Sequence, residues 1–226
     1  MPFFRNGAAD EHLRERRAHG YETSRPDVQA LVPATAKRIL ELGCSTGALG
    51  AALKARNGAF VFGVEIDPEY ARLAERRLDR VAVRDAELFL REGPTDEAPF
   101  DCLIGADVFE HLVDPWTALE RATDLLVPGA TVVISLPNVL YWPGLWRIIR
   151  DGRWPRDDEG VFDRTHLRWF TRQDAVDFLE GAGFRLKSAS PKYYTSGLRL
   201  ALTKAVQRTP FRRFLPPQWL LVAVKP

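Results

Sequence analysis

The sequence predicts an α/β fold, with three layers in which helices cover both faces of a mostly parallel sheet. Short apolar runs alternate with segments of helical periodicity through most of the 226 residues, as crossover helices between parallel strands require. The chain is 46% hydrophobic and 27% charged, so it can bury a sizeable core. We expect a single domain over residues 1–226, with a helical N-terminal segment over residues 1–36.

Composition narrows the class of protein. The formal net charge is only +2, so no nucleic-acid partner is expected. The two cysteines, Cys44 and Cys102, cannot build a disulfide framework, which favours a reduced, cytoplasmic setting. The first ten residues lack the apolar core of a signal peptide. Pro137, Pro143 and Gly144 interrupt the longest apolar stretch, Thr131–Ile149, which we interpret as a strand and a loop.

Individual elements follow from periodicity and capping residues. Asp114 is a suitable N-cap before Pro115, and Thr171 with Asp174 forms a capping-box pattern. The predicted strands are Arg38–Leu42, Phe60–Val64, Val81–Val83, Asp101–Ala106, Thr131–Ser135, Phe184–Ala189 and Trp219–Val224, and the predicted helices are Gly47–Arg56, Asp67–Arg80, Asp114–Val127 and one that Thr171 opens.

The stretch ILELGCSTGALG, Ile39 to Gly50, has the composition of a loop that holds a ligand against exposed backbone. A dinucleotide fingerprint would need glycine at three places, which here hold Gly43, Ser45 and Ala48. A phosphate-binding loop would need Gly-Lys-Ser/Thr at its end, and none is present. The loop therefore does not require a pyrophosphate, which weakens the alternative of a nicotinamide-dependent oxidoreductase.

Acidic residues at successive strand ends indicate a different ligand. Glu41 can meet an ammonium group, Glu65 can accept both hydroxyls of a ribose, and Asp85 can receive an adenine amino group. A cationic amino-acid nucleoside suits this set better than a dianionic pyrophosphate. The predicted cofactor is S-adenosyl-L-methionine (SAM).

Five motifs in order carry a family resemblance. RILELGCSTGALG, VFGVEID, VRDAELF, FDCLIGADVFEHLVDP and GATVVISLPNV resemble the successive motifs of class I SAM-dependent methyltransferases, over roughly Tyr21 to Phe184. The resemblance implies a Rossmann-like, seven-stranded sheet with an antiparallel last strand. The family loop usually has glycine where Ser45 stands.

The resemblance also implies which residues bind the cofactor. Gly43, Cys44, Ser45 and Gly47 would wrap its methionine part, with Glu65 on the ribose. The remaining predicted cofactor-binding residues are Tyr21, Arg25, Glu41, Ile66, Asp85, Ala86 and Ala106.

Two histidine-containing clusters are candidates for catalysis. DVFEH places Asp107, Glu110 and His111 just past the fourth strand, and one helical turn would put all three on one face. FDRTHLRWFT places His166 before the capped helix. Such a set can bind a divalent cation, supply a general base, or form a hydrogen-bonded polar cap.

Both clusters resemble those of ubiquinone-biosynthesis O-methyltransferases. They are also similar to those of small-RNA 3′-end 2′-O-methyltransferases, and in this second family the set binds a metal. Carried over by position, the ligands would be Asp107, Glu110, His111 and His166, with Asp107 replacing a glutamate. The DRTHLR segment is also similar to bacterial methyltransferases of secondary-metabolite and surface-glycan pathways. His166, His111 and Asp107 are the predicted catalytic residues.

The insertion over residues 137–170 is expected to form a substrate lid, with Asn138 facing the acceptor. Its tryptophans interleave with arginines, a composition that suits an apolar cover, a membrane surface or stacked bases. The segment GLRLALTKAVQRTPFRRF, Gly197 to Phe214, is basic and amphipathic, so a lipid-linked acceptor is one alternative.

The leading hypothesis is SAM-dependent methyl transfer to a hydroxyl of a small molecule. An amine acceptor is the near alternative, since an amine can lose its proton after transfer. RNA 2′-O-methylation and a non-catalytic SAM-binding subunit are the further alternatives.

Overall fold

A computed structural model describes residues 22–93, 96–194 and 209–226. The strands are β1 (Arg38–Leu42), β2 (Phe60–Glu65), β3 (Arg80–Val83), β4 (Phe100–Ala106), β5 (Leu126–Pro137), β6 (Arg185–Lys192) and β7 (Gln218–Val224). They form one seven-stranded sheet in the order β3-β2-β1-β4-β5-β7-β6. Strands β1 to β5 run parallel, and β7 pairs antiparallel with β5 and β6. The predicted mostly parallel sheet with an antiparallel last strand is therefore confirmed.

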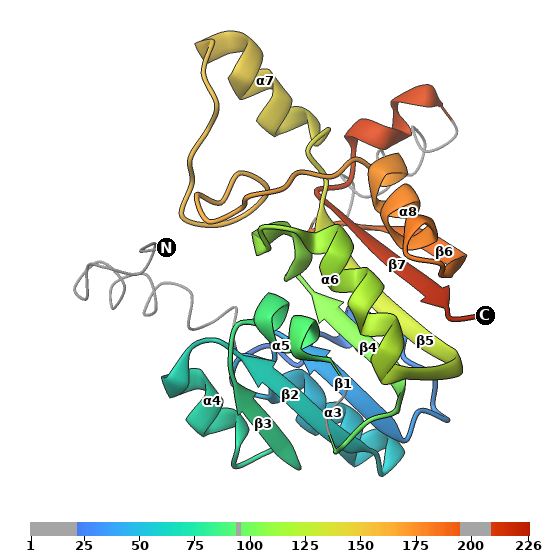
Figure 1. Ribbon diagram of the computed structural model, residues 1–226. Helices are drawn as coiled ribbons and strands as arrows, with labels where there is room; N and C mark the ends of the chain where they lie inside the picture. Colours follow the sequence, from blue (N-terminus) through green and yellow to red (C-terminus); the bar gives the residue numbers. More distant parts are fainter. Residues whose placement is uncertain (1–21, 94–95, 195–208) are drawn as a thin grey trace.

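Helices cover both faces of this sheet (Figure 1). They are α2 (Pro26–Gln29), α3 (Ala48–Asn57), α4 (Pro68–Ala74), α5 (Ala86–Glu92), α6 (Pro115–Ala122), α7 (Trp142–Asp151) and α8 (Arg172–Gly181), with 3₁₀ turns η1 (Phe109–His111), η2 (Thr123–Leu125) and η3 (Pro210–Phe214). Within the described ranges, no helix is long and apolar enough to span a bilayer.

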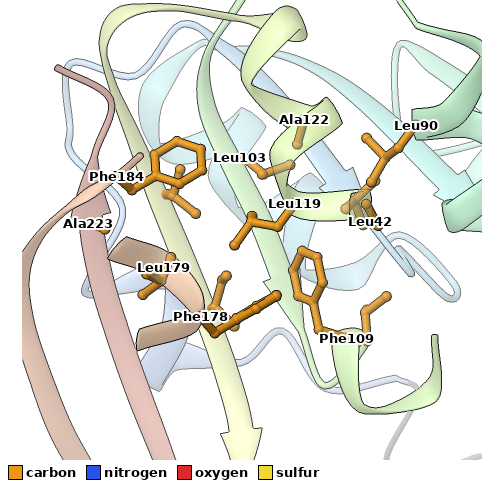
Figure 2. Packing of buried hydrophobic residues seen from close by; sticks show 14 of the residues in the cluster. Leu42, Leu90, Leu103, Phe109, Leu119, Ala122, Phe178, Leu179, Phe184 and Ala223 are labelled. Atoms are coloured by element: carbon orange, nitrogen blue, oxygen red, sulfur yellow. The ribbon is translucent and has the colours of Figure 1, made fainter. Parts of the chain in front are cut away.

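Alternation along the strands divides the core into two layers. In β1, Leu40 and Leu42 pack with the residues of α5, α6 and α8, whereas Ile39 packs with those of α3 and α4. Figure 2 shows the first layer, in which Leu119 and Phe178 meet side chains from the sheet. Successive strand residues point to opposite faces, so a period of two serves both layers at once.

Capping residues fix two of the helices as predicted. Thr171 accepts a hydrogen bond from the N–H of Asp174, whose carboxylate accepts one from the N–H of Thr171, which completes a capping box at α8. Asp114 accepts from the N–H of Thr117 at the start of α6. Each cap satisfies amides that the first helical turn leaves unpaired.

Some predicted elements were wrong in extent. The helix expected over Asp67–Arg80 ends at Ala74, because the carboxylate of Asp79 accepts the N–H of Val61 and draws the chain back to the sheet. The helix expected over Asp114–Val127 ends at Ala122. Helix α5 was not predicted.

The interpretation of Thr131–Ile149 as a strand and a loop was also wrong. Strand β5 starts at Leu126, and α7 occupies Trp142–Asp151. Pro143 lies in the first turn of α7, where a missing N–H costs nothing. Pro143 and Gly144, which were taken to interrupt the apolar stretch, therefore lie at the start of a helix.

Candidate active site at the carboxyl ends of the strands

The candidate site lies where the strand order reverses. Strand β1 is flanked by β2 on one side and β4 on the other, and ligands of such sheets bind outside the carboxyl ends at this switch point. The predicted residues from Glu41 to Asp107 fall on or just after β1 to β4. Tyr21 lies outside the described residues.

Two glycines shape the loop after β1. Gly43 has φ +63°, and a Cβ there would lie 2.5 Å from Cγ2 of Val108. Gly47 has φ +78°, and its Cβ would lie 3.0 Å from Cα of Ala74 in α4. Ser45, where the family usually has glycine, adopts φ 49°. The loop thus keeps the left-handed geometry that favours glycine despite the serine.

The carboxylate of Glu65 holds this loop against the end of β2. Its Oε2 accepts the N–H of Ser45 at 2.8 Å, and its Oε1 accepts the N–H of Asp67 at 2.9 Å. Burial raises the pKa of Glu65, an effect that these backbone hydrogen bonds partly oppose. The next residue, Ile66, is 48% exposed. A buried acid beside an exposed apolar side chain is a suitable pair for a nucleoside, and their roles stay predictions.

Glu41 is a fully buried acid beneath the same loop. Burial raises the pKa of Glu41 to about 8, and the charge of Glu65 adds to the effect. Its Oε2 has no hydrogen-bond partner within the described chain. A Cβ on Gly50 would lie 2.6 Å from that oxygen, so the glycine leaves the carboxylate its room. A nearby ligand cation would offset the cost of ionising it.

The other predicted cofactor residues have mostly structural contacts. Cys44 is buried, and its Sγ lies only 2.5 Å from where a Cβ on Gly63 would be. Asp85 caps α5 by accepting the N–H of Leu88 at 3.0 Å. Ala86 begins α5, and Ala106 ends β4.

Core packing sets the position of the turn after β4. Phe109 of η1 is buried, with its ring centroid 5.3 Å from that of Phe178. A Cβ on Gly105 would lie 2.4 Å from Cε2 of Phe109, so the glycine admits the ring. Glu110 and His111 follow directly and are thereby directed to the site.

Backbone hydrogen bonds bring the second cluster to the first. The carbonyl oxygen of Glu110 accepts the N–H groups of Leu167 at 2.8 Å and Arg168 at 3.0 Å. The rings of His111 and His166 consequently meet edge to face, with centroids 4.7 Å apart. The donor atoms of Glu110, His111 and His166 all lie within 4.8 Å of one another.

The hydrogen bonds define the tautomers of both histidines. Nδ1 of His166 lies 3.0 Å from the carbonyl oxygen of Val161, and Nδ1 of His111 lies 3.2 Å from that of Thr165. A carbonyl oxygen only accepts, and the Thr165 hydroxyl, also 3.2 Å from Nδ1 of His111, donates to Asp163 instead, so each Nδ1 carries the hydrogen. Each neutral imidazole therefore presents a lone pair on Nε2, which suits a metal ligand or a general base.

The electrostatics of this cluster would favour a bound positive charge. Both carboxylate oxygens of Glu110 are buried without a hydrogen-bond partner in the described chain. Burial, and then the charge of Asp107, raise the pKa of Glu110 well above its usual range. Burial, and then the charge of His166, lower the pKa of His111 to about 4. One acid and two imidazole lone pairs form a set that fits a divalent cation.

Asp107 belongs to a different network. Its Oδ2 accepts from Nη1 of Arg25 at 2.6 Å, while its Oδ1 accepts from the hydroxyl of Ser135 at 2.8 Å and from the amide of Gln218. Asp107–His111 does not form the single helical turn that would place Asp107 on one face with Glu110 and His111, because η1 begins at Phe109 and Asp107 has φ 61°. Ser135 and Gln218 were not predicted, although both are polar residues at ends of apolar strands.

Asn138 was expected to face the acceptor, and the structure gives it another contact. It is fully buried, and its amide nitrogen donates to the carbonyl oxygens of Arg213 at 2.9 Å and Pro216 at 2.8 Å. Its Oδ1 accepts the N–H of Leu140 at 3.2 Å. Asn138 therefore joins the start of the insertion to the segment before β7.

Comparisons with known proteins agree with this fold. Residues 12–189 match the family model described as a methyltransferase domain. A ubiquinone biosynthesis O-methyltransferase from Xylella fastidiosa is 31% identical over 144 residues, which cover 60% of this chain and 56% of the relative. This chain thus spans little more than half the length of that curated relative.

Solved structures support the same fold at lower identity. An S-adenosylmethionine-dependent methyltransferase from Mesorhizobium loti superposes with a TM-score of 0.62 at 19% identity, covering 90% of this chain and 98% of that one. The plantazolicin methyltransferase BamL, solved with a triazolic desmethylPZN analogue and S-adenosylhomocysteine (SAH), gives a TM-score of 0.62 at 13% identity over 97% and 90% of the two chains.

The family match extends over most of the chain, and the strand order agrees with it. The chain belongs to the methyltransferase domain family, and its sheet is that of the class I SAM-dependent methyltransferases.

Proposed function

We propose that this protein transfers a methyl group from SAM to a hydroxyl of a small molecule. The observation that carries the proposal is the cluster of buried Glu110 and His166 with half-buried His111, which follows β4 where Val108 contacts Gly43 of the proposed cofactor loop. A methyl transfer needs donor and acceptor held in line. A hydroxyl acceptor also needs a group that takes its proton, and the cluster presents two imidazole lone pairs.

The proposed cofactor site consists of the loop after β1 and the acids around it. Gly43, Ser45 and Gly47 would present backbone to the methionine part, and Glu41 would pair with its ammonium group. Glu65 would accept the ribose hydroxyls, as its position at the end of β2 suggests. Ile66, Asp85, Ala86 and Ala106 would border the nucleoside, and Arg25 would reach the methionine carboxylate.

In the proposed reaction the acceptor oxygen attacks the methyl carbon, and the carbon–sulfur bond breaks with its electron pair going to sulfur. The products are the methyl ether and SAH. The hydroxyl proton passes to Nε2 of His166 or His111, whose Nδ1–H stays bonded to a backbone carbonyl. The insertion over residues 137–170 would cover the acceptor and exclude water.

Glu110, His111 and His166 would also hold a divalent cation, and Asp107 would need to leave Arg25 to join them. When bound, the cation would lower the pKa of the acceptor hydroxyl. Thermal unfolding with and without Mg²⁺, Mn²⁺ or Zn²⁺ tests this, because a bound ion raises the melting temperature. The matched variant Glu110→Gln should lose that shift, and equal shifts in both proteins would contradict the assignment.

Calorimetric titration with SAH is the first test of the cofactor site. Wild type should bind with micromolar affinity, and Glu65→Ala should lose at least about tenfold, since it removes a buried acceptor. Glu75→Ala, an exposed acid after α4, is the matched control and should bind as wild type does. No binding by wild type would remove the basis of the proposal.

Identity of the acceptor then follows from a screen with labelled SAM. Phenols and alcohols with apolar substituents should become methylated, whereas matched amines should not. An amine acceptor would instead support N-methylation. A protein that binds SAH and methylates none of these classes would favour the non-catalytic SAM-binding alternative.

RNA 2′-O-methylation is the remaining alternative. A near-neutral chain offers only local basic patches to a polyanion. RNA binding whose affinity falls steeply with salt would support this alternative over the small-molecule acceptor.

A further inference from the structure

Helix α7 carries an apolar stripe that faces away from the rest of the described chain. Trp142, Trp146 and Ile149 are four and then three residues apart, so they share one face of the helix. They are 50%, 47% and 65% exposed, and the two indole rings lie 5.9 Å apart. An apolar helix face normally packs on a core, so exposure of this one indicates an external partner.

The helix contacts its own protein through the opposite side. Gly144 is buried, and a Cβ there would lie 2.2 Å from Cε2 of Phe162. At about 100° per residue, Gly144 lies roughly opposite the stripe. Arg147 pairs with both carboxylate oxygens of Asp157, at 2.6 and 2.9 Å. These two contacts hold the stripe outward, and Figure 1 shows α7 standing clear of the sheet.

Positive charge exceeds negative charge on α7 and directly after it, since Trp142–Arg156 contains four arginines and one aspartate. Asp151 binds Arg150 and Asp158 binds Arg164, whereas the exposed Glu159 forms no ion pair within the described residues. Arg153 and Arg156 are exposed, and neither forms an ion pair within the described ranges. Local basic excess therefore remains beside the tryptophans after internal pairing.

A second segment with the same character lies at this end of the molecule. In η3, Phe211 is 65% exposed, and it precedes Arg212 and Arg213, which are also exposed. The hydrogen bond from Asn138 to the carbonyl oxygen of Arg213 ties η3 to the start of the insertion that carries α7. Figure 1 shows α7 and the red turn of η3 beyond the same edge of the sheet.

We propose that α7 and η3 dock this protein on an anionic lipid surface. A short helix with tryptophan and isoleucine on one side and arginine on the other is typical of segments that lie in the bilayer interface. Tryptophan favours the headgroup level, and anionic lipids attract the nearby arginines. A stable protein interface uses about 20–30 residues a side, whereas α7 and η3 expose four large apolar side chains. The charge and the small apolar area both favour lipid over a second protein.

Docking in this orientation would turn the carboxyl ends of the strands towards the lipid. The acceptor would then be an amphiphile whose hydroxyl-bearing head reaches the histidines from the bilayer. This inference about the acceptor rests on the proposed methyl transfer. The docking itself does not depend on the reaction.

Vesicle sedimentation tests the docking directly. Full-length protein is mixed with phosphatidylcholine vesicles, alone or with phosphatidylglycerol, and the bound fraction is measured. The test variant is Trp146→Ser with Ile149→Ser, two changes at exposed positions, and the ring contact that it removes, between Trp146 and Trp142, lies within the stripe itself. Leu73→Ser, an apolar side chain 37% exposed on α4, is the matched control. SAH binding by calorimetry and oligomeric state by ultracentrifugation accompany each protein.

Wild type and Leu73→Ser should bind the anionic vesicles, and the double variant should bind about tenfold or more weakly, because it loses most of the inserted apolar area. Higher salt should weaken wild-type binding. Absence of wild-type binding, or equal binding by the double variant, would overturn the proposal. A wild-type dimer that the double variant dissociates, without vesicle binding, would instead assign the stripe to a second copy. Retained SAH binding separates either failure from failure of the proposed function.

Discussion

The guanidinium of Arg25 lies 2.6 Å from the carboxylate of Asp107, although 82 residues separate them in the chain. Asp27 accepts from the same guanidinium at 3.0 Å and pairs with Lys192 at 2.9 Å. Burial alone would lower the pKa of Arg25, and the charge of Asp107 with the hydrogen bonds of Asp27 raises it above its ordinary value. This ion pair fastens the segment before α2 to the end of β4.

Arg25→Ala should reduce the free energy of unfolding by about 1–3 kcal/mol, since it removes charge-assisted hydrogen bonds to both Asp27 and Asp107. Arg80→Ala removes a pair with Glu97 whose arginine is 65% exposed, and should cost no more than about 1 kcal/mol. Urea denaturation of both variants measures the difference. Equal costs would mean that the Arg25 pair behaves as a surface pair.

Glu41 should make the stability of the cofactor-free protein fall as pH rises. Its pKa is about 8 in the folded chain, against an ordinary value of 4.5. Between these values the unfolded chain is ionised and the folded chain stays protonated, so unfolding releases a proton. Stability from this group is complete below pH 4.5 and is lost as pH rises through 8.

Glu41→Gln should remove this dependence. The difference in unfolding free energy between wild type and Glu41→Gln should shift by up to about 1.4 kcal/mol per pH unit across that window. Urea denaturation at intervals of pH provides the measurement, and a difference that does not vary with pH would be evidence against a protonated Glu41.

Gly43→Ala should destabilise the protein more than a backbone effect alone predicts. Its φ of +63° costs an alanine about 1 kcal/mol, and the overlap with Val108 adds about 1–3 kcal/mol. Gly152→Ala has the same φ of +63° with open space around it, so it should show only the backbone cost. Adding Val108→Ala to Gly43→Ala should recover part of the loss, and failure of that rescue would show that crowding is not the cause.

His111→Asn with His166→Asn should lower turnover of a hydroxyl acceptor by about 10²–10⁴-fold. The asparagine amide can replace each Nδ1–H donor while removing the Nε2 lone pair. SAH affinity should stay within about twofold, as calorimetry checks, because the change is local. An unchanged rate would favour an amine acceptor or a structural role for both histidines.

Local patterns predicted the elements whose signals are local. The capping box of Thr171 and Asp174 and the strand Arg38–Leu42 depend on neighbouring residues, and both stand as predicted. Helix α7 was not predicted, because proline and glycine such as Pro143 and Gly144 usually interrupt helices and the sequence does not show their contacts in the folded chain. A glycine is needed at position 144 because a larger side chain would overlap with Phe162. No pattern within the helix indicates that contact.

For the candidate site, the sequence analysis named the residues that meet in the cluster, but it placed one further residue among them. The roles of the cluster residues in catalysis and metal binding stay predictions. Glu110, His111 and His166 meet as the resemblance implied. The resemblance and the possible helical turn also grouped Asp107 with them, but its left-handed backbone directs it to Arg25, Ser135 and Gln218. These partners come from distant strands, so only the assembled sheet brings them together.

The carbonyl oxygen of Glu110 accepts the N–H groups of both Leu167 and Arg168. Contact between the two histidines can therefore be followed in solution through these two amides. Those two amides lose their acceptor whenever the segment carrying His166 lifts away. Their hydrogen–deuterium exchange rates therefore report how often the two clusters separate. This measurement needs no substrate.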